Sequence, residues 1–442
     1  MSRLRPSIGR RAFSAGSRAA TRNRESGGSS MTQAVEASLE VARSCTNNLV
    51  AFLREMIAIP AESGHEGERC KRVYQEYERL GFEEVFFDRL GNVVARIGNG
   101  PLKILMDGHI DCVGVGDPKA WKHDPFRGKL EDGKIWGRGA VDELPAIACM
   151  AYGAKILRER GFPAAVTLYL TASVMEEACD GYCLLHLIEK EGIRPHAVIL
   201  GEPTDLNVYR GHRGRLEATI TTRGKSVHGA HSDLGVNALY KMAPIISDVE
   251  TLHRRLLHDP FLGKGSVVVS FIECTSPSLN AVPDSARIYI DRRLTVGETV
   301  ESAMNELRSL PRLGDAEVEL LTYDETSWRG ERARQEKYYP TWVLREDHAL
   351  VQGVARAVEA VPGKPPAISR WSFSTNGVAS MGRLGIPTVG FAPGLEELAH
   401  TTREWVAVDD LVRATAVYSL IPEFLASHKG ELMAAAAFKN GE

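Results

Sequence analysis

The stretch LMDGHIDCVGVG, Leu105–Gly116, ends an apolar run with a histidine and a carboxylate two residues apart, His109 and Asp111. In an extended strand, side chains at that spacing point to the same side. His109 could then ligate a metal through one ring nitrogen while Asp111 accepts the proton on the other and fixes the tautomer. A lone His-x-Asp pair is more often a loop hydrogen bond, so the metal interpretation depends on the rest of the chain.

Further residues of metal-ligand or acid–base type follow apolar strand-like runs or lie in turns and loops: Asp142, Glu176, Glu177, Glu202 and His400. Each has an ordinary interpretation when taken alone, such as a helix cap, a solvated helix start or a turn residue. Three of the sites, however, follow strands predicted to be parallel. Open α/β sheets bind ligands beyond the carboxyl ends of their strands, so these loops should meet, and the set as a whole favours a metal centre.

Histidine with several carboxylates suits zinc, with cobalt and manganese as alternatives. One bridging carboxylate can hold two such ions about 3.5–4 Å apart, where water loses a proton near neutral pH and attacks a carbonyl. The doublet Glu176-Glu177 fits this scheme, because one carboxylate can bind metal while its neighbour carries the proton to the leaving amine. Phosphoester hydrolysis is disfavoured, since the sequence has no phosphate-cradling glycine loop.

Bulk composition narrows the class of protein. A chain of 442 residues is expected to form two domains, and 43% hydrophobic with 25% charged residues is typical of a globular protein. A formal net charge of −3 indicates neither nucleic acid nor an anionic membrane as a partner. No apolar run approaches the roughly 20 residues of a membrane span. Seven scattered cysteines argue against a disulfide framework and favour a reducing cytoplasm.

The pattern of elements predicts an α/β fold with an insertion. Strands alternating with helices over residues 31–212 indicate a catalytic domain with a mainly parallel sheet covered on both faces. Residues 213–325 read as βαββαβ, the order of an inserted ferredoxin-like α+β domain. Residues 326–442 return to the catalytic domain. Residues 1–30 hold seven arginines and one acidic residue. We expect a disordered extension there, with an incomplete mitochondrial presequence or twin-arginine signal as alternatives.

The motifs GHIDCV, WGRGAVDEL, VMEEACDG, GEPT, GKSVHGAHS, NAVPDSARIYIDRR and LAHTTREWV resemble those of a co-catalytic di-zinc superfamily. This superfamily contains aminoacylase, acetylornithine deacetylase and succinyl-diaminopimelate desuccinylase, together with dipeptidases and glutamate carboxypeptidases. The resemblance extends from Met31 to about Ala426. The stretch EKYYPTW, with LREDHALV after it, further resembles a bacterial branch of selenium-metabolism-linked hydrolases, a label that names no substrate.

The resemblance implies two zinc ions per subunit. His109 and Glu202 would bind one ion, Glu177 and His400 would bind the other, and Asp142 would bridge them. The superfamily usually follows its bridging aspartate with a lysine and a glycine, whereas Glu143-Leu144-Pro145 stands here. Because these residues are not ligands in the superfamily, the metal centre should survive while the loop beside it has another shape.

Catalytic roles follow from the same resemblance. Asp111 would orient His109, and Glu176 would be the general acid/base. A histidine of the inserted domain would reach across a homodimer and polarise the substrate carbonyl in the neighbouring active site. His228 matches this histidine, and His231 is the rival candidate.

Two substrate contacts are carried over more loosely. Asn280 matches an oxyanion contact and Arg292 a contact to the substrate carboxylate, although an ordinary strand-end charge explains Arg292 equally well. We therefore predict a metal-dependent amidohydrolase that cleaves small N-acyl amino acids of the acetyl or succinyl type. The alternatives are a dipeptidase or carboxypeptidase of the same superfamily and, from another class, a non-catalytic metal-loaded binding or scaffold protein. An intact Glu176 argues against the scaffold.

Overall fold

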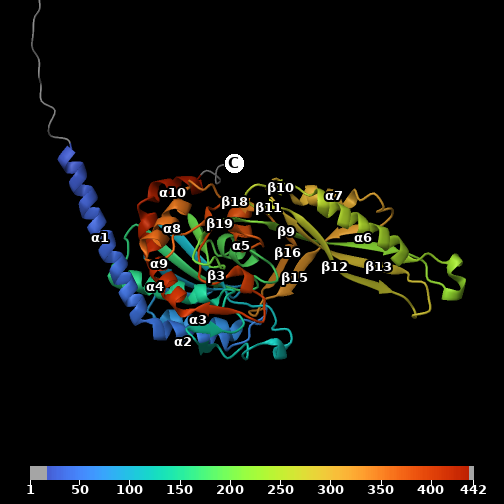
Figure 1. Ribbon diagram of the computed structural model, residues 1–442, viewed down its shortest axis with the longest axis horizontal. Helices are drawn as coiled ribbons and strands as arrows, with labels where there is room; N and C mark the ends of the chain where they lie inside the picture. The colour runs from blue at the N-terminus through green and yellow to red at the C-terminus, as the bar shows by residue number, and fades with distance from the viewer. Residues whose placement is uncertain (1–16, 438–442) are drawn as a thin grey trace, which may run out of the picture.

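The computed structural model describes residues 17–437 (Figure 1). Part of the extension predicted to be disordered, residues 1–16, lies outside the described residues. From Ser17 the prediction differs from the structure, because the chain is helical in α1 (Ser17–Ser44). Alanine and arginine both favour helix. The arginine-rich composition that indicated disorder is therefore also compatible with a helix. In the described range, no helix is long and apolar enough to cross a membrane.

A nine-stranded sheet forms the centre of the larger part of the molecule. Its order is β1 (Glu84–Phe87), β2 (Val93–Ile97), β6 (Val166–Ser173), β3 (Leu102–His109), β7 (Ala197–Leu200), β20 (Thr388–Gly390), β8 (Val208–His212) and β18 (Trp342–Val343), with β19 (Ile368–Trp371) also pairing with β8. The middle strands β6, β3, β7 and β20 are parallel, whereas antiparallel pairs lie toward the edges. The expected α/β class with a mainly parallel centre is confirmed.

Helices pack on this sheet and leave its middle strands almost completely buried (Figure 1). They are α2 (Thr46–Ile57), α3 (Gly67–Arg79), α4 (Leu144–Arg160), α5 (Tyr182–Glu189), α8 (Ala349–Ala360), α9 (Val408–Ala426) and α10 (Lys429–Ala437). Helix α4 is apolar nearly all round because it lies between the sheet and α9. At their crossing a Cβ on Gly153 would come within 2.8 Å of the Cβ of Tyr418, so this close approach requires glycine.

The chain between the two halves of the central sheet forms a second sheet with its own core. The sheet order is β12 (Ser266–Thr275), β13 (Ser285–Leu294), β9 (Gly214–Arg223) and β14 (Glu317–Leu320), all antiparallel. Helices α6 (Ala238–Arg255) and α7 (Val300–Arg308) pack on it. The element order is the expected βαββαβ, with a small hairpin of β10 (His258–Asp259) and β11 (Gly263–Lys264) added before β12.

Two connections join this inserted part to the central sheet. On the way out, only Arg213 separates β8 from β9. On the way back, the ribbon of β15 (Thr322–Thr326) and β16 (Arg332–Glu336) spans the boundary expected at residue 325. Strand β17 (Tyr338–Tyr339) still pairs with β9, so the inserted sheet extends beyond that boundary.

Candidate metal centre

Three neighbouring strands bring the first group of candidate residues together. Strand β3 lies between β6 and β7 and is parallel to both. His109 is the last residue of β3 and aligns with Ser173, the last residue of β6. Glu176 and Glu177 follow β6, and Glu202 follows β7. These side chains therefore meet at the carboxyl edge of the sheet, as the sequence predicts.

A small sheet brings the second group to the same place. Strands β4 (Lys129–Glu131) and β5 (Lys134–Trp136) precede the turn that carries Asp142, and β21 (Trp405–Ala407) follows the loop that carries His400. Pairing of β5 with β21 sets the turn beside the loop. Glu404 fixes the turn, because its buried carboxylate accepts hydrogen bonds from the backbone N–H groups of Gly139 at 3.0 Å and of Asp142 at 3.3 Å.

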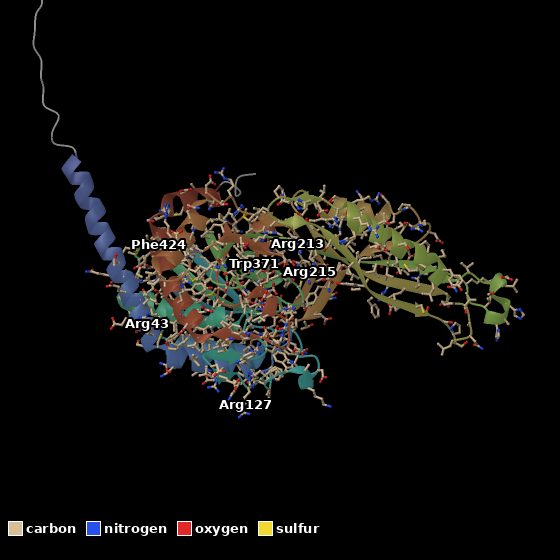
Figure 2. All side chains as sticks on the ribbon, in the orientation of Figure 1. Arg43, Arg127, Arg213, Arg215, Trp371 and Phe424 are labelled. Atoms are coloured by element: carbon tan, nitrogen blue, oxygen red, sulfur yellow. The ribbon has the colours of Figure 1, made fainter. Side chains whose placement is uncertain are left out.

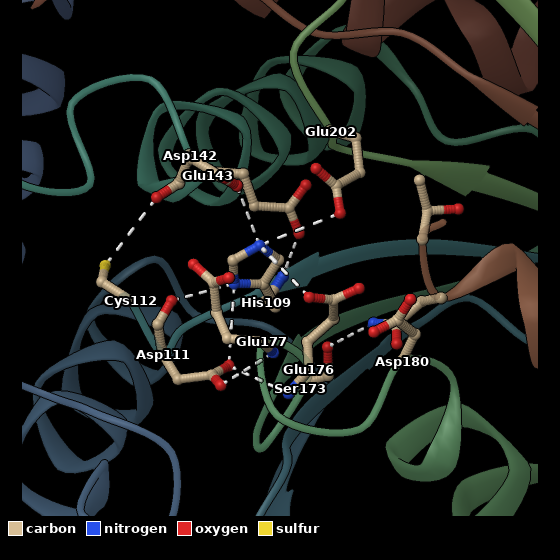
Figure 3. Close-up of polar contacts among 12 residues, drawn as sticks. His109, Asp111, Cys112, Asp142, Glu143, Ser173, Glu176, Glu177, Asp180 and Glu202 are labelled. Atoms are coloured by element: carbon tan, nitrogen blue, oxygen red, sulfur yellow. Dashed lines mark hydrogen bonds and ion pairs between the residues drawn. The ribbon is translucent and has the colours of Figure 1, made fainter. Parts of the chain in front are cut away.

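The carboxylate of Asp142 lies between the two histidines (Figure 3 shows its contact with His109). Its Oδ1 is 2.9 Å from Nε2 of His109, and its Oδ2 is 3.1 Å from Nε2 of His400. Glu177 Oε2 lies 3.1 Å from the same nitrogen of His400, and Glu202 Oε1 lies 3.8 Å from Nε2 of His109. Each oxygen of Asp142 thus faces a different imidazole, which is the arrangement that a bridging carboxylate needs.

The electrostatics of this cluster fit bound cations. Burial raises the pKa values of Glu176, Glu202 and Glu143 well above the usual range, and neighbouring carboxylates raise them further. One oxygen of each, Glu176 Oε1, Glu202 Oε2 and Glu143 Oε2, is buried without a hydrogen-bond partner. Hydrogen bonds to Asp142 and Glu177 raise the pKa of His400 to about 10. A site with so many buried carboxylates favours positive charge, and imidazole with carboxylate is a zinc-type donor set.

Asp111 lies beside His109, but its carboxylate does more than orient that ring. Nδ1 of His109 is 2.9 Å from the backbone carbonyl oxygen of Asp111 and 3.6 Å from its carboxylate. The carboxylate accepts hydrogen bonds from the backbone N–H groups of Glu176 and Glu177, at 3.2 and 3.1 Å, and from the Ser63 hydroxyl at 2.6 Å. Asp111 therefore positions both the imidazole and the doublet.

Glu143 is the residue that sequence reasoning missed. It was expected only to reshape the loop after Asp142, yet its buried carboxylate accepts a hydrogen bond from the backbone N–H of His109. Ligand atoms of His109, Glu143 and Glu202 lie within 4.8 Å of one another, as do those of His109, Asp142 and Glu177. The available signal was a second acidic residue, directly after Asp142, within the otherwise apolar run AVDELPAIA, which predicts a buried carboxylate with a specific partner.

The candidate metal cluster forms one wall of a cavity of about 950 Å³ that also reaches the inserted part. Besides the cluster, residues from several elements line it, including Asp180, Asn207, Tyr209, Arg215, Arg293, Phe373 and Ser374. Arg215 makes an ion pair with Asp180. Arg293 is held by two hydrogen bonds to Asp291, at 2.8 and 3.0 Å. The cavity therefore combines a carboxylate-rich wall with arginines on the side of β9 and β13.

The structure places Arg292 away from the cavity, so its predicted role as a contact to the substrate carboxylate is not supported by this geometry. Arg292 does not line the cavity but is fully buried, and its guanidinium makes ion pairs with Glu298 and, at 2.9 Å, with Glu306. Its neighbour Arg293 lines the cavity instead. Successive side chains of a strand point to opposite faces, so adjacent arginines in β13 have different surroundings, which the sequence does not distinguish.

His228 and Asn280 lie apart from the metal cluster of their own chain. Both side chains are exposed, and neither lines the cavity. They lie on neighbouring segments, because the backbone N–H of Gly229 donates to the carbonyl of Asn280 at 2.7 Å. The rival His231 is exposed in the same loop. The structure thus keeps these candidates together, in the β9–α6 and β12–β13 connections, away from His109.

The fold and the histidine–carboxylate cluster define a metal-dependent hydrolase. The model of peptidase family M20/M25/M40 matches residues 105–423, and the chain belongs to this family. This membership confirms the superfamily resemblance of the motifs.

Two curated relatives match most of the chain. The uncharacterized protein YgeY of Escherichia coli (strain K12) is 46% identical over 386 residues, which cover 87% of this chain and 96% of YgeY. A succinyl-diaminopimelate desuccinylase of Methylorubrum extorquens is 28% identical and covers 84% of this chain and 97% of its own length.

Two crystal structures show the same fold at low identity. Human carnosine dipeptidase 1 aligns with a TM-score of 0.67 at 16% identity, over 89% of this chain and 99% of its own. Bacillus subtilis YxeP, described as a dinuclear metal-binding peptidase, aligns with a TM-score of 0.64 at 14% identity, over 87% and 99%.

Proposed function

We propose that this hydrolase uses two metal ions to cleave the amide bond of N-acyl amino acids. The observation that carries the proposal is Glu176. Its carboxylate reaches 3.9 Å from Nε2 of His109, while its other oxygen is buried and has no hydrogen-bond partner in the described chain. A free carboxylate beside a complete ligand set is what proton transfer requires and what simple metal storage does not.

The histidines and carboxylates of this cluster would hold two ions in the manner that the sequence predicts. His109 and Glu202 would bind one ion, Glu177 and His400 the other, and Asp142 both. Zinc suits these donors, with cobalt and manganese as alternatives. When bound, such ions lower the pKa of water and polarise a carbonyl.

The chain's own residues would then move the proton. Glu176 would take it from the attacking water and deliver it to the nitrogen of the leaving amine. Burial and the nearby carboxylates of Asp180 and Glu177 raise the pKa of Glu176, which makes this carboxylate a stronger base toward the proton of water. The Asp111 carboxylate accepts hydrogen bonds from the backbone N–H groups of Glu176 and Glu177 and so fixes the backbone from which the Glu176 side chain extends.

Arg293 would bind the carboxylate of the amino acid. It lines the cavity on the face of β13 opposite to Arg292. A planar guanidinium matches a carboxylate with two parallel hydrogen bonds, although Asp291 now occupies part of it. Asn280 stays a proposed oxyanion contact from the partner subunit, together with His228.

The inserted part would form a homodimer through its edge strand. β12 is the last strand of its sheet and exposes Val268, Phe271 and Ile272, and Leu279 follows it fully exposed. An exposed apolar edge strand readily pairs with a second copy and buries its side chains. Such a dimer would bring His228 of the partner subunit toward the cavity, where an imidazole could polarise the scissile carbonyl.

A dipeptidase or carboxypeptidase activity is the second candidate function. We retain this alternative because the chain has the same fold as carnosine dipeptidase 1. A non-catalytic scaffold is less favoured because Glu176 is intact. We also propose the cytoplasm as the location, since all seven cysteines are free thiols in the structure.

The test is metal content together with turnover on a panel of acetyl-, succinyl- and formyl-amino acids and dipeptides. Glu176→Ala is assayed beside wild type, and Glu359→Gln on the exposed face of α8 serves as the control. Two ions per chain with turnover on an acylamino acid, lost only in Glu176→Ala, would support the proposal. Two ions without turnover on any amide would favour the scaffold, and turnover on dipeptides alone would favour the second candidate.

A further inference from the structure

A second hollow opens beside the candidate active site. It has a volume of about 340 Å³ and shares Ser372 and Glu396 with the wall of the larger cavity. Its remaining lining includes three cationic side chains, Arg213, Lys264 and Arg370. None of the candidate metal ligands lines it, so it lies beyond the reacting end of the larger cavity.

The Arg213 guanidinium is held by hydrogen bonds to backbone carbonyls, and it makes no ion pair with a carboxylate of the described chain. Arg213 is the single residue between β8 and β9, at the junction of the two parts of the molecule (Figure 2). Its Nε donates to the carbonyl of Ser372 and its Nη1 to the carbonyl of Lys264, each at 3.0 Å. These acceptors are neutral. Burial lowers the pKa of Arg213, and the positive charges of Arg293 and Arg370 lower it further.

The other two cations come from different segments. Arg370 lies on β19 and faces the ring of Phe261, 5.7 Å from its centroid. Lys264 ends the β10–β11 hairpin. Within residues 17–437, none of the three makes an ion pair with a carboxylate. Glu396 is the one acid in the lining, and its Oε1 already accepts from the hydroxyl of Ser372 at 2.6 Å.

Three cations converging from three segments with one partly occupied carboxylate leave an excess of positive charge. Like charges repel, so this arrangement costs free energy unless an anion joins it. Guanidinium groups bind carboxylates with directed hydrogen bonds. Because Ser372 and Glu396 line both the hollow and the larger cavity, the anion can belong to a molecule that also extends toward the metal cluster.

We propose that Arg213, Lys264 and Arg370 form a subsite for a second carboxylate of the substrate, remote from the scissile amide. The assignment rests on the proposed amide hydrolysis and narrows its substrate class to acylamino acids with an additional carboxylate. That carboxylate can lie on the acyl part, as in a succinyl group, or on the amino acid, as in a glutamate side chain.

Binding of matched compounds tests both sources. N-succinyl-alanine is compared with N-butyryl-alanine, and N-acetylglutamate with N-acetylglutamine, by calorimetric titration of the metal-loaded protein in a Glu176→Gln background. Loss of turnover in this background keeps the compounds intact. We expect the acid of one pair to bind at least tenfold more tightly than its neutral partner at low ionic strength, and the preference to shrink with added salt.

Two variants locate the subsite. Arg370→Gln removes an exposed cation that makes no side-chain hydrogen bond to the rest of the described chain, and Arg213→Gln removes the partly buried one. Each should reduce the preference at least threefold and leave binding of the neutral compound unchanged. Arg127→Gln, an exposed arginine remote from the hollow (Figure 2), is the matched control.

The outcomes separate the subsite from the activity. A preference that survives both arginine variants, or no preference in either pair, overturns the subsite. A preference that the two variants reduce, in a protein whose Glu176-intact form hydrolyses none of the four compounds, keeps the subsite and contradicts the proposed hydrolysis of such substrates.

Discussion

The carboxylate of Asp111 accepts a hydrogen bond from the backbone N–H of Glu177 at 3.1 Å, although 66 residues separate the two in the chain. The backbone carbonyl of Asp111 contacts the ring of His109 on the other side. One residue therefore fixes groups that we assign to different metal ions. This explains why a carboxylate that would bind no metal is itself completely buried.

Asp111→Asn should weaken metal binding without abolishing it. An amide has one acceptor oxygen in place of two, and its N–H₂ group would face the N–H donors of the doublet. Loss of such a supporting group typically costs 10–100-fold in metal affinity or activity. Competition with a chelator measures the affinity. Asp132→Asn, at an exposed turn, is the control, and equal affinity in both variants would contradict the role of Asp111.

Glu176→Gln should lower turnover by about 10²–10⁴-fold while both ions stay bound. Glutamine keeps the shape and polarity of the buried side chain but cannot carry a proton at neutral pH. Metal analysis and steady-state kinetics are measured on the same preparation. Loss of an ion from this variant would mean that Glu176 is a ligand rather than the proton carrier.

The ligand assignment predicts different metal contents for two variants. His400→Ala removes a ligand of one ion only, so the other ion should remain. The His400 ring is about half exposed, so its removal should disturb the packing little. Asp142→Ala removes the bridge, so both ions should be lost or bound much more weakly. Elemental analysis after dialysis gives the stoichiometry. Equal losses in the two variants would argue against separate sites joined by Asp142.

Much of the fold was predictable because its signals are local. Alternating strands and helices were expected over residues 31–212, and helix α4 and strand β7 are two of the elements that the structure has there. Both are apolar runs that end at glycine or polar residues. The convergence of His109, Glu177 and Glu202 followed from the rule that ligands bind beyond the carboxyl ends of parallel strands.

The features that sequence reasoning missed depend on contacts between distant segments. Glu143 is buried where its carboxylate accepts from the His109 N–H, and Arg292 differs from Arg293 because only Arg292 faces Glu298. The hollow beside Ser372 is lined from β8–β9, β11 and β19, which no local pattern relates. Sequence patterns indicate residue types well, but the direction of each side chain is set by tertiary packing.

His212 should make stability depend on pH. Its ring is fully buried in β8, where Nδ1 accepts from the N–H of Thr375 at 3.0 Å and Nε2 contacts the carbonyl of Pro340 at 3.2 Å. Burial lowers its pKa to about 3, so the ring is neutral in the folded protein. In the unfolded chain the pKa is about 6.5, and below that value the unfolded state binds the extra proton.

The free energy of unfolding should therefore fall with decreasing pH below about 6.5, by up to about 1.4 kcal/mol per pH unit from this residue. Urea unfolding of the metal-free protein at pH 7.0 and 5.5 measures the effect. The loss of stability between the two pH values should be about 1 kcal/mol smaller in His212→Gln than in wild type. Equal losses would show that His212 is not the titrating group.

If His228 acts in the neighbouring active site, Glu176→Gln and His228→Ala dimers are each inactive for different reasons. A mixed dimer would have one working site, in which the His228→Ala chain supplies Glu176 and its partner supplies the histidine. Random exchange makes half of the dimers mixed, so an equal mixture should recover about a quarter of wild-type activity.

Mixing Glu176→Gln with Glu202→Ala is the control. Both residues act in the active site of their own chain, so each chain carries a defective site and no intact site can form. Recovery in the first mixture alone would support transfer across the dimer, and full activity of His228→Ala by itself would contradict it.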